Sequence, residues 1–241
     1  MGSAGEVTQE RLAELRRRMA AVPARGAGAT TRRSLRREAL PVPSALVELL
    51  PDGGLPKGSV VAYAGAGSLL TGLLAAVTGS GGHAAVVGLP RLGLLAAAEM
   101  GARLDRLAVV PDPGSDPVEV AAVLLDGLDL VVLGLGGLSV PPSRTRVLAA
   151  RARSKGATLV VTGGAWSGPA LRIESRVAGY GGLGRGCGRL RTLRLDVRVH
   201  ARTAPPRTGS LELTPRAGRV EWIAAQPNTP RRLSTVREAV S

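Results

Sequence analysis

The centre of the chain alternates between short apolar segments and helical segments, and this pattern limits the fold more than any other feature. Five segments rich in Val and Leu are expected as strands, at residues 59–64, 83–88, 106–111, 129–134 and 157–163. Helical segments lie between them, at residues 68–79, 91–101, 116–127 and 143–156. Because the strands lack polar residues at alternate positions, both faces of their sheet should be covered. The sequence therefore predicts an α/β protein with a mostly parallel central sheet.

The pattern changes after Trp166. Four segments alternate apolar with polar or basic residues, at 171–182, 190–202, 209–215 and 218–225. We expect these to be antiparallel strands added to the sheet in the C-terminal third. The glycine-rich residues 179–191 are interpreted as a mobile loop between two of the strands.

Both ends of the chain differ from its centre. Leu12, Leu15 and Met19 recur at helical spacing near the N-terminus and are candidate partner-binding residues. We divide the chain into an N-terminal helix with a basic linker (1–40), an α/β core (41–225) and a disordered basic tail (226–241). The N-terminus lacks the apolar core of a signal peptide, and no apolar run of about 18 residues is present, so a cytoplasmic protein is expected.

The net charge of +14 is unevenly distributed. Residues 1–40 carry nine Lys and Arg against four Asp and Glu, whereas residues 41–142 carry four against nine. Residues 143–241 carry nineteen against five. Basic flanks of this kind can attract nucleic acid or an acidic protein, and the sequence leaves both possibilities open.

Few residues in the chain could carry catalysis or bind a metal ion. Cys187 is the single cysteine, which excludes an internal disulfide and a cysteine-based zinc site, and the two histidines lie far apart. Asp105, Asp112 and Asp116 lie near predicted strand ends and are interpreted as turn and helix-cap residues. We expect neither a metal nor another cofactor.

The segment YAGAGSLLTGLL, residues 63–74, lies between a predicted strand and a predicted helix, which is the context of a phosphate-binding loop. The loop keeps Gly65, Gly67, Ser68 and Thr71, but it is one residue shorter than the motif. Leu70 stands where the motif has its phosphate-binding Lys. Without that cation a triphosphate would face an apolar side chain, so we interpret the loop as vestigial.

The run GGLPKGSVVAYAG, followed by a helix and four more strands, resembles the ATPase core of the RecA recombinase family. The E-x-G-x-x-x-D-x-L junction from Glu99 to Leu107 and the segment LDLVVLGLGGLSVPP extend the resemblance over roughly residues 43–200. It implies a RecA-like three-layer core. Within that superfamily the chain is most similar to the degenerate ImuA proteins of the actinobacterial ImuA-prime type.

The resemblance also locates the catalytic positions of the family, and each is altered in this sequence. Gly134 stands where a Walker B Asp would help to hold Mg²⁺, and Pro90 stands at about the place of the glutamate that activates water. Gly163 and Gly164 occupy the region of a γ-phosphate-sensing Gln. We therefore expect a protein that keeps the fold but is not an ATPase.

ImuA-type proteins act in damage-induced mutagenesis, so the resemblance implies a non-catalytic adaptor in error-prone translesion DNA synthesis. Its partner would be an ImuB-like polymerase-related protein, and through it a C-family DNA polymerase and the sliding clamp. Binding would use the N-terminal helix or the lateral faces of the core. The protein would be associated with the nucleoid when engaged on DNA.

Arginines around the glycine-rich segment are the candidate DNA contacts that the resemblance suggests. They are Arg172, Arg176, Arg185, Arg189, Arg191 and Arg194. The chain has no Phe and few other aromatic residues, so we expect electrostatic contacts that depend steeply on salt. Two alternatives remain open at this point: an SOS inhibitor of cell division resembling SulA, and a recombinase paralogue that binds DNA.

Overall fold

The structure is a computed structural model that describes residues 39–183, 188–202, 204–216 and 218–225. The chain divides into two units, Met1–Arg37 and Glu38–Ser241, and every described residue belongs to the second. The predicted N-terminal helix with Leu12, Leu15 and Met19, the tail 226–241, and Arg185 lie outside the described residues. Ala39 and Leu40 form strand β1, which pairs with β2 (Leu55–Pro56), so these two residues are part of the second unit.

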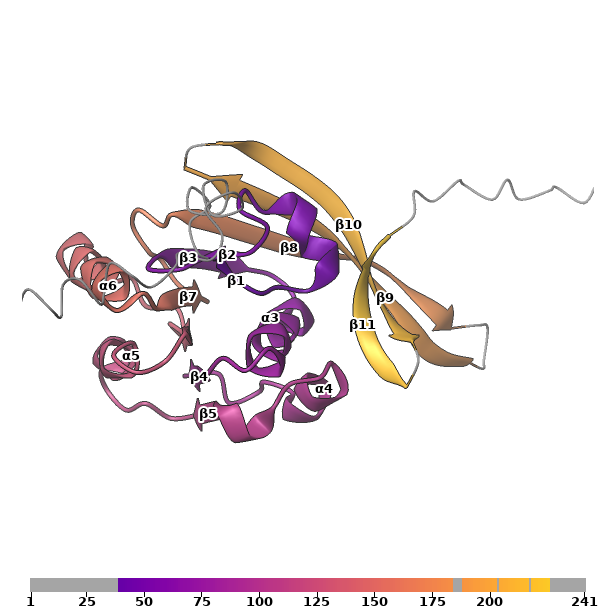
Figure 1. Ribbon diagram of the computed structural model, residues 1–241, viewed down its shortest axis with the longest axis horizontal. Coiled ribbons are helices and arrows are strands. Elements are labelled where there is room, and N and C mark those ends of the chain that lie inside the picture. The colour runs from indigo at the N-terminus through magenta and orange to yellow at the C-terminus, as the bar shows by residue number, and fades with distance from the viewer. Residues whose placement is uncertain (1–38, 184–187, 203, 217, 226–241) are drawn as a thin grey trace, which may run out of the picture. The chain divides into compact units, whose positions relative to one another are not determined.

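A nine-stranded mixed sheet forms the centre of the fold, in the order β11-β10-β9-β8-β3-β7-β6-β4-β5 (Figure 1). Its parallel part consists of β3 (Val60–Ala64), β4 (Ala84–Val87), β5 (Leu107–Val110), β6 (Leu130–Gly134) and β7 (Thr158–Thr162). The remaining strands are β8 (Leu171–Leu183), β9 (Gly188–Ala201), β10 (Ala204–Arg216) and β11 (Arg219–Ala224), which we call the C-terminal extension. Within the extension neighbouring strands are antiparallel, while β8 is parallel to β3. The prediction of a mostly parallel sheet with antiparallel strands added at its C-terminal side is confirmed.

Helices cover both faces of the parallel strands (Figure 1). One face carries α3 (Gly67–Gly79), with α4 (Leu94–Glu99) beside it, and the other carries α5 (Pro117–Leu124) and α6 (Pro142–Lys155). Two short 3-10 helices, η1 (Ser44–Leu49) and η2 (Leu104–Arg106), complete the described elements. Alternate residues of each strand enter the two apolar cores, which is why these strands are apolar throughout.

Local sequence signals set the ends of the two helices α5 and α6. The predicted cap Asp116 is confirmed, since its Oδ1 accepts a hydrogen bond from the Glu119 N–H at 3.1 Å at the start of α5. Helix α6 begins at Pro142, whose missing N–H costs nothing in the first turn. It ends at Gly156, which adopts a left-handed conformation with φ of 68°.

Helix α3 is buried almost all round, because the C-terminal extension returns to cover it. Trp222 of β11 lies against Gly72, where an added Cβ would be only 2.7 Å from the indole Nε1. A glycine in the middle of this helix is therefore required by the close approach of the indole. This contact joins the last strand of the sheet to the helix that follows β3.

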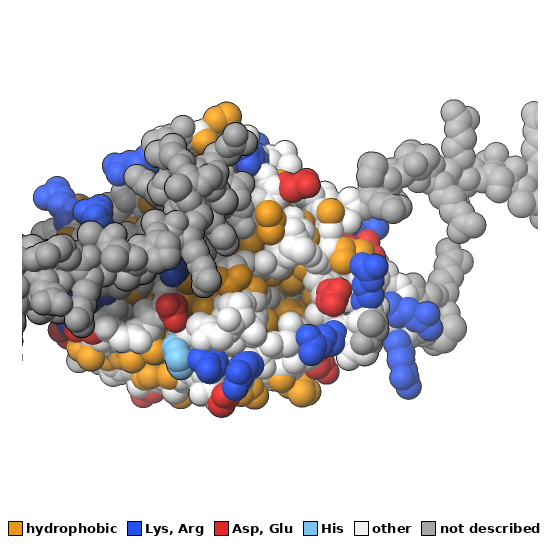
Figure 2. Space-filling view, viewed as in Figure 1, with side chains coloured by type: hydrophobic (Ala, Val, Ile, Leu, Met, Phe, Trp, Pro, Cys, Tyr) orange, Lys and Arg blue, Asp and Glu red, His pale blue; other side chains and the backbone are white. Residues whose placement is uncertain are grey.

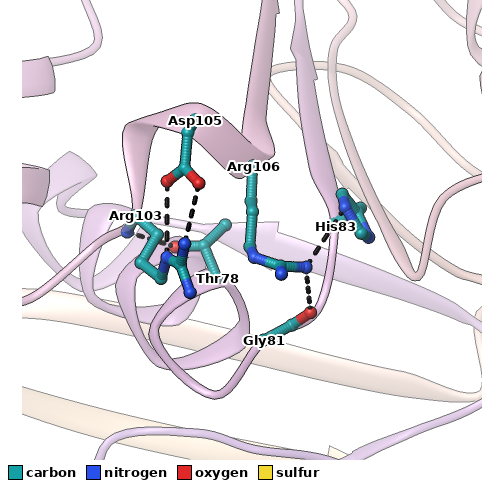
Figure 3. Close-up of polar contacts among 6 residues, drawn as sticks. All are labelled: Thr78, Gly81, His83, Arg103, Asp105 and Arg106. Atoms are coloured by element: carbon teal, nitrogen blue, oxygen red, sulfur yellow. Dashed lines mark hydrogen bonds and ion pairs between the residues drawn. The ribbon is translucent and has the colours of Figure 1, made fainter.

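At the far end of α3, a group of polar contacts holds the loops that precede β4 and β5 (Figure 3). Arg106 donates a hydrogen bond to the Gly81 carbonyl at 2.6 Å and lies 3.2 Å from His83 Nε2. Arg103 forms an ion pair with Asp105 at 2.9 Å, and the neighbouring guanidinium lowers the pKa of that carboxyl. Asp105 lies inside the short 3-10 helix η2, and its carboxylate bonds the Arg103 side chain.

The prediction of a loop over residues 179–191 is wrong for most of its length. Strand β8 continues to Leu183 and β9 begins at Gly188, with irregular register after Val177 and again after Gly181. Glycine is tolerated here because the neighbouring strand approaches closely: a Cβ at Gly181 would lie 2.1 Å from Thr192 Oγ1. The pairing of β8 with β9 therefore outweighs the turn preference of the glycines.

Candidate functional site

A cavity of about 560 Å³ opens at the carboxyl ends of β3, β4 and β7, between the start of α3 and the loop before α4. Parallel α/β sheets bind their ligands at this edge, and the volume suits a small molecule. The cavity is lined by Tyr63, Gly65, Gly67, Ser68, Leu70, Thr71, Leu89, Pro90, Arg91, Leu92, Gly93, Ala96 and Thr162. All four residues predicted for the vestigial loop, Gly65, Gly67, Ser68 and Thr71, are brought together here.

The lining of this carboxyl-edge cavity is mainly apolar. Leu70, at the position of the phosphate-binding Lys, is 3% exposed and belongs to the core around α3. Thr71, the residue that would hold Mg²⁺ in a working loop, instead donates its hydroxyl hydrogen to the Gly67 carbonyl at 2.9 Å. Arg91 is the one charged residue of the lining, and its side chain is exposed. These residues offer no buried cation to a triphosphate.

The backbone of the loop is held against β8 by Ser175, a residue that the sequence does not single out. The Ala66 N–H donates to Ser175 Oγ at 2.9 Å, so this amide is already bonded to a side chain. The Tyr63 hydroxyl lies 2.9 Å from the same Oγ and donates to the Ala66 carbonyl at 2.5 Å. Gly65 has a φ of 126° and passes so close to Ser175 that a side chain would not fit. A loop that binds phosphate needs free backbone amides, and here the Ala66 amide is already bonded to Ser175 of β8.

Burial raises the pKa of Tyr63 from 10.0 to about 12, and its hydrogen bond with Ser175 opposes part of that rise. Since an unfolded chain ionises its tyrosines first, the folded state should keep its full stability below pH 10. It should lose about 3 kcal/mol as the pH rises to about 12. Urea unfolding of the wild type and of Tyr63→Phe across this range measures the effect. The variant should lack that loss, and parallel curves for the two proteins would contradict the assignment to Tyr63.

Of the three glycines at positions that the resemblance equates with catalytic residues, Gly134 and Gly164 have no room for a side chain, whereas a Cβ at Gly163 would meet nothing closer than 3.8 Å. A Cβ at Gly134, the Walker B position, would lie 2.6 Å from the Gly88 carbonyl oxygen and 2.6 Å from Leu89 Cδ2. A Cβ at Gly164, in the sensor region, would lie 2.3 Å from the Leu138 carbonyl oxygen. The ends of β4 and β6 thus touch where an acid would project. Pro90, at the position of the activating glutamate, is exposed at the edge of the cavity.

The candidate DNA-contacting arginines separate into two groups. Arg172, Arg176 and Arg194 lie on the face of the C-terminal extension that is opposite α3, which we call the open face. Two of the three have a carboxylate beside them: Arg176 lies opposite Asp196 in the register, and Arg194 lies 3.3 Å from Glu212, whereas Arg172 lies opposite His200. A groove of about 690 Å³ on this face is lined by residues of both signs. Arg189 and Arg191 lie farther along β9, towards its first residue.

The acidic residues near the strand ends do not form a site. Asp112 accepts a hydrogen bond from the Gly114 N–H at 3.0 Å within its turn. Asp116 caps α5 and pairs with Arg144 at 2.6 Å, which lowers the pKa of its carboxyl. In the part of the chain that the structure describes, no three His, Cys, Asp or Glu residues lie together as metal ligands. No helix in the same ranges is long and apolar enough to cross a bilayer.

The fold and the cavity define an α/β protein with a large mixed sheet and an apolar cavity at the carboxyl edge of its parallel strands. Comparison with known families matches residues 48–168 to the MT3502 N-terminal domain. The uncharacterized protein Rv3395c of Mycobacterium tuberculosis (strain ATCC 25618 / H37Rv) is 53% identical over 173 residues, which cover 71% of this chain and 78% of the relative. The chain belongs to the MT3502 N-terminal domain family. The matched region ends before β8, so the C-terminal extension lies beyond it.

Proposed function

We propose that this chain is a RecA-like protein of the ImuA-prime type that has no ATPase activity and serves as an adaptor in error-prone translesion DNA synthesis. The strand, loop and helix formed by β3, residues 65–66 and α3 match the arrangement of a phosphate-binding loop, which supports the RecA-like assignment. The relative from M. tuberculosis is consistent with a protein of actinobacterial type. The partner is an ImuB-like polymerase-related protein.

The packing at two positions beside the carboxyl-edge cavity supports the non-catalytic part of the proposal. Phosphoryl transfer needs a cation on the phosphates and an acid that holds Mg²⁺. Leu70 is buried at the first position, and the contact between Gly134 and Gly88 leaves no space at the second. A sequence that had merely lost one catalytic residue would leave the space for it open. Here the chain has packed the space, which favours a role for the fold in binding.

Two surfaces are available for the partner. The first is the segment 1–37, which contains the predicted helix. The second is the outer edge of the parallel sheet, at strand β5, where apolar side chains are exposed on neighbouring elements. These are Leu95 (74% exposed), Leu104, Val109 and Val123 (59% exposed). An apolar edge of this kind is a site for association with another protein.

Co-purification of the full chain with its ImuB-like partner tests the proposal. We expect a stable complex that forms equally well with and without Mg²⁺ and ATP. Deletion of residues 1–37 leaves the buried Leu40 in place and removes only the first surface. The pair of substitutions Leu95→Asp and Val109→Asp disrupts the second surface, and Val147→Asp, an exposed position on α6, serves as its control.

Loss of the complex with the deletion would assign the interface to the N-terminal segment, and loss with the paired substitutions would assign it to the β5 edge. In either case Val147→Asp should bind as the wild type does. If the full chain does not form a complex, or if the complex depends on ATP hydrolysis, the proposed function is wrong.

A further inference from the structure

The excess positive charge of the C-terminal extension gathers at one end of it. Arg189 and Arg191 lie at the start of β9, and Arg216 and Arg219 face each other across the hairpin between β10 and β11. Since β9 and β10 pair up to Leu193 and Leu213, all four residues extend past the same end of that ladder. We call this group the arginine tip. Figure 2 shows Lys and Arg side chains gathered at this end of the molecule.

All four side chains of the arginine tip are exposed. Among the described residues none of them has a carboxylate within ion-pair distance, and the nearest acid along these strands is Glu221. Unpaired guanidinium groups that are free to move towards a ligand give the strongest contacts with phosphate, which they hold in a two-pronged geometry.

The open face has as many arginines as the arginine tip, but acidic residues lie among them. Its four arginines are Arg172, Arg176, Arg194 and Arg198, and its acids include Glu174, Asp196 and Glu212. Register pairs Glu174 with Arg198 and Arg176 with Asp196, so opposite charges lie directly across from each other. Of the four, Arg194 is the one with an ion pair among the described residues, to Glu212. An anionic polymer gains less on such a surface than on the arginine tip, because three acids lie among the four arginines and repel it.

The shape of the arginine tip favours nucleic acid. Beyond Leu193 the strands β8 and β9 continue as a glycine-rich two-stranded ribbon that carries Tyr180 (60% exposed) and Leu190 (55% exposed). The major groove of B-DNA admits a two-stranded β-ribbon, and arginines on neighbouring strands can then reach the phosphates on either side. We propose that the arginine tip binds the phosphate backbone of duplex DNA without sequence preference, with this ribbon in the groove. The proposal does not depend on the adaptor role, since the chain alone suffices to test it.

Fluorescence anisotropy with a fluorescein-labelled duplex of arbitrary sequence tests the proposal with the full chain. The tip variant combines Arg189→Gln, Arg191→Gln, Arg216→Gln and Arg219→Gln. The control variant combines Arg172→Gln, Arg176→Gln, Arg194→Gln and Arg198→Gln, and removes the same charge from the same extension. The tip variant should bind at least about tenfold more weakly, and the slope of log K against log salt should fall by about 0.9 for each phosphate that the variant no longer binds.

The control variant should bind within about twofold of the wild type, because Glu174, Asp196 and Glu212 lie among its arginines and offset their attraction for the duplex. Circular dichroism melting checks that both variants are folded. Equal losses in the two variants would show that only net charge matters, and no loss in the tip variant would place binding elsewhere in the chain. Either result would overturn the proposal. So would displacement of the duplex by polyglutamate at equal charge concentration, which would identify a surface for acidic proteins.

Discussion

Replacing Gly134 by Ala should lower the free energy of unfolding by about 3 kcal/mol, although the change adds a single methyl group. The added Cβ would lie 2.6 Å from the Gly88 carbonyl oxygen, and neither strand can move without disturbing the buried centre of the sheet. Gly134→Asp, which introduces the acid that the proposed resemblance to RecA-like ATPases places here, should be more destabilising still. Its carboxylate would be placed among apolar groups beside Leu89.

Urea unfolding curves of the purified variants measure this effect. Gly127→Ala is the matched control, since an added Cβ there meets nothing within 4 Å and its φ is not in the left-handed region. Its stability should change by no more than about 0.5 kcal/mol. If Gly134→Ala were as stable as the control, the carboxyl edge would have room for an acid, and the packing at Gly134 could no longer support a non-catalytic protein.

Trp222→Ala should cost about 3 to 5 kcal/mol of folding stability, the range expected for loss of a large buried aromatic side chain. Trp222 is 4% exposed and packs on Gly72 in the middle of α3. Its removal would leave a cavity between β11 and α3 that the rigid helix and sheet cannot fill. Because this residue lies in the last described strand, the loss would show that the C-terminal extension stabilises the parallel part of the sheet.

Tyr180→Ala provides the control, since Tyr180 is also an aromatic residue of the extension but is exposed on the ribbon. It should leave stability within about 0.5 kcal/mol of the wild type. Thermal or urea unfolding followed by far-UV circular dichroism separates the two variants. A cost below about 1 kcal/mol for Trp222→Ala would mean that the extension and the parallel sheet unfold independently.

Much of the fold can be predicted from the sequence, because the signals involved are local. The apolar runs that become β3 to β7 and the helical segments between them are read from spacing over about ten residues. Asp116 and Gly156 mark helix ends through contacts with their own neighbours in the chain. The prediction of a loop at residues 179–191 is wrong because it also relies on local signals. Glycines there resemble a loop locally, but pairing with β9 makes most of them part of a strand.

The candidate site likewise has some features that are visible in the sequence and others that depend on the tertiary structure. The absence of a Lys at position 70 and of an acid at position 134 is visible in the sequence, and it is the basis for the prediction of a vestigial phosphate-binding loop. Whether the vacated positions remain open depended on the tertiary structure. Gly88 and Gly134 meet only because β4 and β6 are neighbours in the sheet, and Ser175 reaches Ala66 across 109 residues of chain.

The sequence by itself determined the α/β class, the order of the central elements and the excess of arginine in the last third. Only the tertiary structure decided which of those arginines lie opposite an acid. Arg176 and Asp196 are twenty residues apart, and their pairing follows from the register of β8 and β9. Register is set by packing over the whole sheet, so it cannot be read from neighbours in the chain. The same packing gathered Arg189, Arg191, Arg216 and Arg219 at one end of the C-terminal extension, where Glu221 is the nearest acid along these strands.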